Sequence, residues 1–174
     1  VVLENWVEEH GGYVFHSVKH PTKAFDVDHI LLVGSLMFLV DDKNWSPSYK
    51  YTFQEANHGA TAYRNGVTFP GNEIRSAWQL RTMRQLFPGQ KMSAFLNISS
   101  PKPTELVGNL SFPTVSVCQT HILKWLIMNG QAAWKAVYPL DMRENDDVDL
   151  ATLAKLAELA TWTNQTHLMI EEDD

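Results

Sequence analysis

The longest apolar stretch of the chain is residues 30–40, ILLVGSLMFLV, which only Gly34 and Ser35 interrupt. A membrane-spanning helix needs about 20 apolar residues, so this stretch is too short to cross a bilayer and we expect no membrane span. We expect it to form buried core instead. Its length and its leucines and methionine favour a helix, for which Asp26 or Asp28 is a suitable cap. Its valines and Gly34 leave a buried strand as the alternative.

Other segments predict further helices. Asn72 is a good N-cap, and Pro88-Gly89 end the apolar pattern that follows it. Near the C-terminus, three aspartates precede leucines at helical spacing, which is typical of an amphipathic helix. The expected helices are residues 2–10, 72–87, 114–128, 131–137 and 146–162.

Strands are predicted in a smaller part of the chain. Residues 13–18 read as a strand, and residues 49–69 contain alternating segments with the hairpin-turn pair Asn65-Gly66. The predicted fold is therefore mainly α, a helical domain with a small antiparallel β-element. A helix-poor α+β fold is the alternative.

The length of 174 residues predicts one globular domain, residues 1–170. Residues 99–113 hold three prolines and Gly108, which predicts a proline-rich loop or an arm that reaches a neighbouring copy. Residues 171–174 form an acidic tail.

Charge is unevenly distributed along the chain. The whole chain has a formal net charge of −6, yet residues 43–102 contain eight basic and two acidic residues. Aromatic residues are interleaved with these bases. Cationic side chains neutralise phosphates and flat rings stack on unpaired bases, so this segment predicts binding of single-stranded RNA or DNA. The expected contacts are Arg64, Arg75, Arg81, Arg84 and Lys91 for phosphate, and Tyr63 and Trp78 for stacking.

The same asymmetry predicts a second property. A basic face on one copy can meet an acidic face on the next, and such a heterologous contact builds rings or helices. Our first functional hypothesis is therefore a self-assembling structural subunit, similar in kind to a coat or nucleocapsid (capsid) protein of a virion. It is not an enzyme under this hypothesis, it needs no cofactor, and its partners are copies of itself and nucleic acid. A plain interaction domain that binds an acidic protein is an alternative.

The histidines support a different alternative. Four of the seven histidines lie within residues 10–29. Histidine and aspartate together suit a divalent metal, which can activate water for hydrolysis. The second hypothesis is therefore a small metal-dependent hydrolase. Its candidate ligands are His16, His20, Asp26, Asp28 and His29.

Cysteine usage and the termini bear on location. The one cysteine, Cys118, excludes an internal disulfide, and no basic segment precedes an apolar stretch as in a secretory signal. We therefore expect an intracellular (cytoplasmic) location or a place within a virion, not secretion. Three glycosylation sequons, at Asn97, Asn109 and Asn164, would matter only in a secreted protein.

Overall fold

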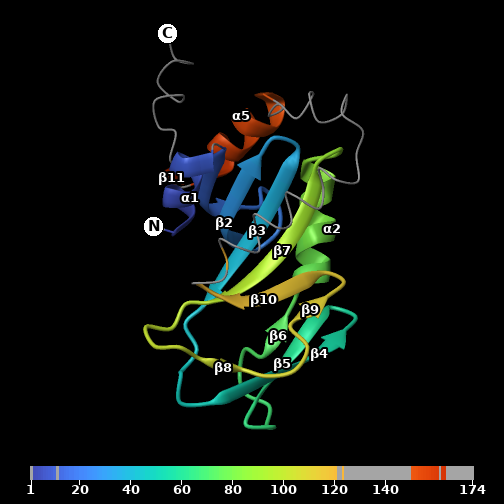
Figure 1. Ribbon diagram of the computed structural model, residues 1–174. Helices are drawn as coiled ribbons and strands as arrows, with labels where there is room; N and C mark the ends of the chain where they lie inside the picture. Colours follow the sequence, from blue (N-terminus) through green and yellow to red (C-terminus); the bar gives the residue numbers. More distant parts are fainter. Residues whose placement is uncertain (1, 11, 121–122, 124–149, 161, 164–174) are drawn as a thin grey trace, which may run out of the picture. The chain divides into compact units, whose positions relative to one another are not determined.

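The computed structural model describes residues 2–10, 12–120, 123, 150–160 and 162–163 (Figure 1). Of these residues, 44% lie in strands and 22% in helices, and the strands form two mixed sheets. The prediction of a mainly α fold is therefore wrong. The described part of the chain is mostly β, with three short helices.

The helices are α1 (Val2–His10), α2 (Ser76–Leu86) and α5 (Leu150–Leu159). The strands are β1 (Tyr13–Lys19), β2 (Asp26–Val33), β3 (Leu36–Lys43), β4 (Lys50–Ala56), β5 (Gly59–Arg64), β6 (Glu73–Ile74), β7 (Lys91–Ile98), β8 (Glu105–Leu106), β9 (Ser111–Phe112), β10 (Val115–Gln119) and β11 (Trp162–Thr163). One sheet has the strand order β11-β1-β2-β3-β7-β10-β9, and the other has the order β6-β5-β4-β8.

The apolar stretch of residues 30–40 forms the hairpin of β2 and β3, not a helix. Val33 pairs with Leu36 across a two-residue loop, and Gly34 at its first position has φ 58. Glycine at that position is typical of type II′ hairpin turns. Leu31 and Leu32 are both buried although they point to opposite faces of β2, so both faces of the strand are covered there. A strand covered on both faces shows no alternation of polar and apolar residues, which is why the sequence favoured a helix.

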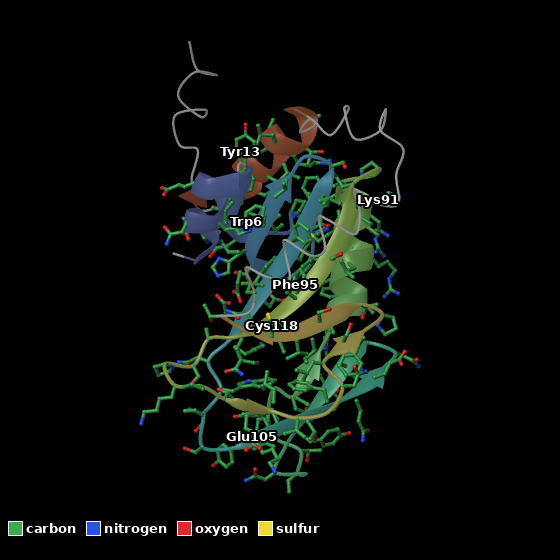
Figure 2. All side chains as sticks on the ribbon, viewed as in Figure 1. Trp6, Tyr13, Lys91, Phe95, Glu105 and Cys118 are labelled. Atoms are coloured by element: carbon green, nitrogen blue, oxygen red, sulfur yellow. The ribbon has the colours of Figure 1, made fainter. Side chains whose placement is uncertain are left out.

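The chain divides into two compact units, residues 1–40, 89–92 and 124–174, and residues 41–88 and 93–123. In the first unit β1 pairs with β2 and β11, and both α1 and α5 pack against β1. Trp6 of α1 is fully buried in this unit (Figure 2), as are Phe15 of β1 and Leu156 of α5. Leu3 and Val7 are buried with Trp6, as expected for one face of a helix that packs on a sheet.

The second unit contains α2, the four-stranded sheet and a shared apolar core. α2 packs against β5, which pairs with β4 and β6. The core takes buried side chains from several strands and one connecting segment: Tyr51, Phe53, Ala60, Ala62, Phe69, Ile74, Leu96, Ile98, Val115 and Val117. Most of the aromatic residues of the basic segment are therefore core residues.

Several predicted elements are confirmed. α1 matches the predicted helix of residues 2–10, and α5 lies within the predicted acidic-start helix of residues 146–162. The strand of residues 13–18 is β1, and residues 49–69 contain the antiparallel pair β4 and β5. Asn65 and Gly66 have φ 51 and 80 and form the predicted tight turn, which Arg64 and Val67 close.

Other predicted elements differ from the structure. The helix predicted for residues 72–87 is α2, but it begins at Ser76 because Glu73 and Ile74 form β6, which pairs with β5. The helix predicted from residue 114 is wrong at its start, since residues 115–119 form β10. There Val115 and Val117 are buried and Ser116 is half-buried, an alternation typical of a strand. The helix predicted for residues 131–137 and the acidic tail of residues 171–174 lie outside the described residues.

Residues 99–113, predicted as a loop or arm, contain the short strands β8 and β9. β8 pairs in parallel with β4, and the Gln119 side chain bonds both the backbone N–H and the carbonyl oxygen of Thr104. None of the described helices is both long and apolar enough to cross a membrane.

Candidate nucleic-acid interface

The exposed side of α2 carries two arginines of the predicted interface. Leu80 and Met83 are buried under the helix, whereas Arg81 and Arg84 are exposed. Residues three apart are neighbours on a helix surface, so these two guanidinium groups form one positively charged patch. Arg84 lies in the last turn, where the helix dipole favours a cation. Within the part of the chain that the structure describes, neither arginine forms an ion pair or a hydrogen bond, so both can meet an anion from solvent.

Arg75 lies directly before α2 and has a partner. Its Nη2 donates to Oε2 of Glu73 at 3.2 Å, and both side chains are more than half exposed. Exposed ion pairs of this kind contribute about 0–1 kcal/mol. A phosphate group can therefore replace Glu73 at little cost, so Arg75 extends the patch of Arg81 and Arg84 without being its main part.

Arg64 has different surroundings from the other arginines. Its Cζ lies 4.7 Å from the ring centroid of Tyr49 and 4.5 Å from that of Phe69. Cation–π contacts of this kind are worth about 0.5–1 kcal/mol at exposed sites. Burial raises the pKa of the neighbouring Tyr51 hydroxyl, and the charge of Arg64 acts in the opposite direction. Arg64 therefore serves mainly to stabilise the aromatic cluster of its own unit.

The two predicted stacking residues are both half-buried. Trp78 lies on α2 three residues before Arg81, beside the arginine patch, and Tyr63 lies on β5 opposite Thr52. Tyr49 is 38% exposed, more than either of them. Trp78 is the better stacking candidate, because helical spacing places it next to Arg81.

Lys91, the remaining predicted phosphate contact, is exposed at the start of β7. It belongs to the first unit, whereas the arginines belong to the second. The interface that we describe therefore consists of Arg81 and Arg84, with Arg75 and Trp78 beside them, and we call these four residues the α2 patch.

The structure brings two of the five predicted metal ligands together. His16 of β1 and His29 of β2 are cross-strand partners, and their Nδ1 atoms lie 2.6 Å apart. Behind His16, Oε1 of Glu4 lies 2.8 Å from its Nε2. Sequence reasoning missed Glu4, because only the packing of α1 on β1 brings it to His16.

The other three predicted ligands have separate surroundings. Nδ1 of His20 accepts hydrogen bonds from the backbone N–H groups of Thr22 at 3.0 Å and Lys23 at 2.9 Å. Asp26 is exposed at the start of β2. Asp28 is on the same strand directly before His29, so the side chains of Asp28 and His29 point to opposite faces of the strand. Among the described residues, no group of three or more histidine, cysteine or acidic side chains is placed to hold a metal ion.

The polar end of β3 is a second feature that the sequence did not single out. Asp41, Asp42 and Lys43 are half-buried and directly follow the buried residues of this strand. Strand alternation places Asp41 and Lys43 on one face and Asp42 on the other. Oδ1 of Asp42 accepts a hydrogen bond of 2.9 Å from Nδ2 of Asn97. The signal in the sequence was a charged group of three residues at the end of its longest apolar stretch.

Cys118 and the sequons have structural explanations. Cys118 of β10 lies close to β7 in Figure 2, and its Sγ is 3.7 Å from the carbonyl oxygen of Leu96. Burial, with a smaller effect from Asp42, raises the pKa of this thiol to about 12, so it is not a nucleophile near neutral pH. Asn97 is 4% exposed, which excludes glycosylation of the folded chain there, whereas Asn109 is exposed. Asn164 lies outside the described residues.

Comparison of the chain with protein-family models, with curated proteins and with solved structures found no match.

Proposed function

We propose that this protein binds single-stranded nucleic acid through the α2 patch. The observation that carries the proposal is the exposure of Arg81 and Arg84 on one side of α2, with no carboxylate of the described chain paired to either. A guanidinium group donates two parallel hydrogen bonds to a phosphate, and two such groups on neighbouring turns can hold successive parts of a flexible backbone.

The neighbouring residues extend this binding mode. Arg75 supplies a third cation once its weak pair with Glu73 opens. Trp78 offers a ring beside Arg81, and base–aromatic stacking contributes about 1–3 kcal/mol per base without selecting a sequence. We therefore expect binding that prefers single strands to duplexes and depends little on base sequence.

The test is a fluorescence anisotropy titration of a labelled single-stranded oligonucleotide. We expect the double variant Arg81→Ala with Arg84→Ala to bind at least about tenfold more weakly than the wild type, because two phosphate contacts are lost. The matched control is Lys19→Ala with Lys23→Ala, which removes the same charge from exposed positions of the first unit. Equal loss of affinity in both double variants would show that only net charge matters and would overturn the proposal.

Self-assembly, as in coat and nucleocapsid subunits, stays a prediction from the charge asymmetry of the sequence. Light scattering of the purified protein with and without the oligonucleotide tests it. If assembly requires nucleic acid and fails in the arginine double variant, self-assembly depends on nucleic-acid binding by the α2 patch. The absorbance of the purified protein distinguishes the two kinds of partner. If it is typical of nucleic acid, the partner that the protein carries is nucleic acid and not an acidic protein.

A second candidate function is divalent-metal-dependent hydrolysis of the bound nucleic acid. The observation that favours it is the pair Asp41 and Lys43 on one face of β3. Magnesium is commonly held by one or two carboxylates together with substrate phosphates, and a lysine ammonium stabilises phosphate charge. In this proposal Asp41 binds the cation and Lys43 contacts the phosphate. The chain then acts on the polymer that the α2 patch binds.

The test of this second candidate is release of labelled fragments from a single-stranded oligonucleotide in the presence of magnesium. We expect cleavage to stop with a chelator and to fall at least about a hundredfold in Asp41→Asn and in Lys43→Met. Asp26→Asn and Asp28→Asn belong in the same experiment, because both carboxylates were candidate ligands from the sequence, and both variants should cleave as the wild type does. Magnesium-dependent cleavage that is equal in all four variants would point to a contaminating nuclease and contradict the assignment.

A further inference from the structure

The pair of His16 and His29 lies in the first unit and has no part in the α2 patch. The antiparallel register sets the two residues directly opposite each other on β1 and β2. Their rings meet edge to face, with centroids 4.8 Å apart and an interplanar angle of 86°. Both rings therefore point their Nδ1 atoms at the same place, where these atoms are 2.6 Å apart.

The carboxylate of Glu4 lies beside one ring nitrogen of His16. Its Oε1 lies 2.8 Å from Nε2 of His16 and favours a proton on that atom. The lone pair of His16 is then on Nδ1, so His29 must supply the proton between the two Nδ1 atoms. Burial lowers the pKa of His16, and the neighbouring His29 lowers it further while Glu4 acts in the opposite direction.

We propose that Nδ1 of His16 and Nδ1 of His29 form a two-histidine site for a divalent transition metal ion. Zn²⁺, Ni²⁺ or Cu²⁺ replaces the shared proton, which leaves Nδ1 of His29 for solvent while Nε2 of that ring takes up a proton, so that both ligands stay neutral. Glu4 behind His16 is its positioning residue. Metal-binding histidines usually hold their second ring nitrogen against a carboxylate, which fixes the tautomer and raises the basicity of the ligand atom. The Glu4–His16 contact has this arrangement.

The required movement is small. Zinc–nitrogen distances of 2.0–2.1 Å in a tetrahedral site separate the two nitrogens by about 3.3 Å. The rings must therefore open by less than about 1 Å, which side-chain rotation can provide. The described residues offer no third protein ligand, so water or a small anion completes the coordination. This incomplete protein coordination predicts moderate affinity and an open position for an exogenous ligand.

The backbone of Ser17, the residue after His16, has an unfavourable conformation. It has φ 51, in the left-handed region that residues other than glycine rarely adopt, although it lies inside β1. The pairs on either side of it, His16 with His29 and Val18 with Val27, keep the same register. Unfavourable backbone conformations of this kind cost of order 1–3 kcal/mol and occur most often at functional sites.

The test is calorimetric titration of the tag-free protein with Zn²⁺, Ni²⁺ and Cu²⁺. We expect one ion per chain, with Cu²⁺ bound most tightly, as the general order of these ions requires. His29→Gln and His16→Gln should each weaken binding more than tenfold, and Glu4→Gln about tenfold through the lost positioning contact. The exposed His20→Gln variant and Asp41→Asn should bind as the wild type does, which separates this site from the magnesium site proposed above.

A second measurement covers the case in which a histidine variant fails to fold. In the wild-type protein, the imidazole resonances of His16 and His29 should respond together to Zn²⁺, and those of His20 and His58 should not. Equal binding by the wild type and the His16→Gln, His29→Gln double variant would overturn the proposal. So would imidazole resonances of the pair that do not change at saturating metal.

Discussion

At the scale of single residues, the buried polar groups of the second unit explain why the lone cysteine is inert. Asn97 is almost fully buried, and its Nδ2 lies 2.9 Å from Oδ1 of Asp42 and 3.0 Å from Oγ1 of Thr120. Buried polar groups need such partners, since an unpaired one costs about 1–3 kcal/mol. Cys118 lies beside this network, where burial and the carboxylate of Asp42 both oppose its ionisation.

This environment predicts the reactivity of Cys118. Because its pKa is raised to about 12, the reactive thiolate is rare in the folded state at mildly alkaline pH and increases about tenfold with each pH unit. We expect a thiol reagent to modify the native chain at least about a hundredfold more slowly than the chain in denaturant. The measurement is the absorbance released by an aromatic disulfide reagent. Equal rates in the two states would contradict the buried position of the thiol.

At the scale of elements, one glycine limits how β5 packs at its start. Gly59 has φ 138, and a Cβ there would collide with the carbonyl oxygen of Ile74 and with Oγ of Ser76. These atoms belong to β6 and the first residue of α2, so a side chain at Gly59 pushes apart the elements that carry the α2 patch.

We therefore expect Gly59→Ala to lower the free energy of unfolding by more than about 2 kcal/mol, from backbone strain and overpacking together. The control is Gly71→Ala, where φ is 77 and a Cβ meets no atom within 4 Å. That variant should lose only the backbone cost of about 1–2 kcal/mol. Urea unfolding of both variants measures the difference, and equal losses would contradict the close packing at Gly59.

The elements also show what the sequence could and could not predict. The amphipathic helices α1 and α5 and the Asn65-Gly66 turn were predictable, since each depends on local spacing and turn chemistry. The β2–β3 hairpin was not, because both faces of its strands are buried and the run of apolar residues hides the period of two. In β10, buried valines were assigned to a helix because the residues of β7 with which this strand pairs are 21 positions earlier in the sequence.

In the candidate sites, too, some features depend on local sequence and could be predicted, whereas others depend on the tertiary fold. The exposure of Arg81 and Arg84 followed from the helical pattern of α2, so the sequence predicted the exposed positions of these two arginines. The cation–π contacts of Arg64 depend on Tyr49 and Phe69, which only the tertiary fold brings to it. The pairing of His16 with His29 depends on strand register, which hydrophobic pattern alone left open.

At the scale of the whole molecule, the charge asymmetry is the feature that suggests a polyanionic partner. An acidic chain that concentrates eight of its fourteen basic residues between positions 43 and 102 keeps a local attraction for phosphate despite its net charge of −6. Only part of that basic segment is available to a phosphate. Nζ of Lys50 lies 3.8 Å from Oε1 of Glu105, and the guanidinium group of Arg64 contacts the rings of Tyr49 and Phe69. Binding therefore depends on few cations, and we expect moderate affinity with a salt dependence that reflects this small number of phosphate contacts.

The most direct measurement is the salt dependence of oligonucleotide binding by the wild type and by the Arg81→Ala, Arg84→Ala variant. Each phosphate contact to a single strand contributes about −0.7 to the slope of log K against log salt concentration. The loss of two contacts should therefore flatten the slope by about 1.4. A slope that stays the same in the variant would show that these arginines do not touch phosphate and would contradict the proposed interface.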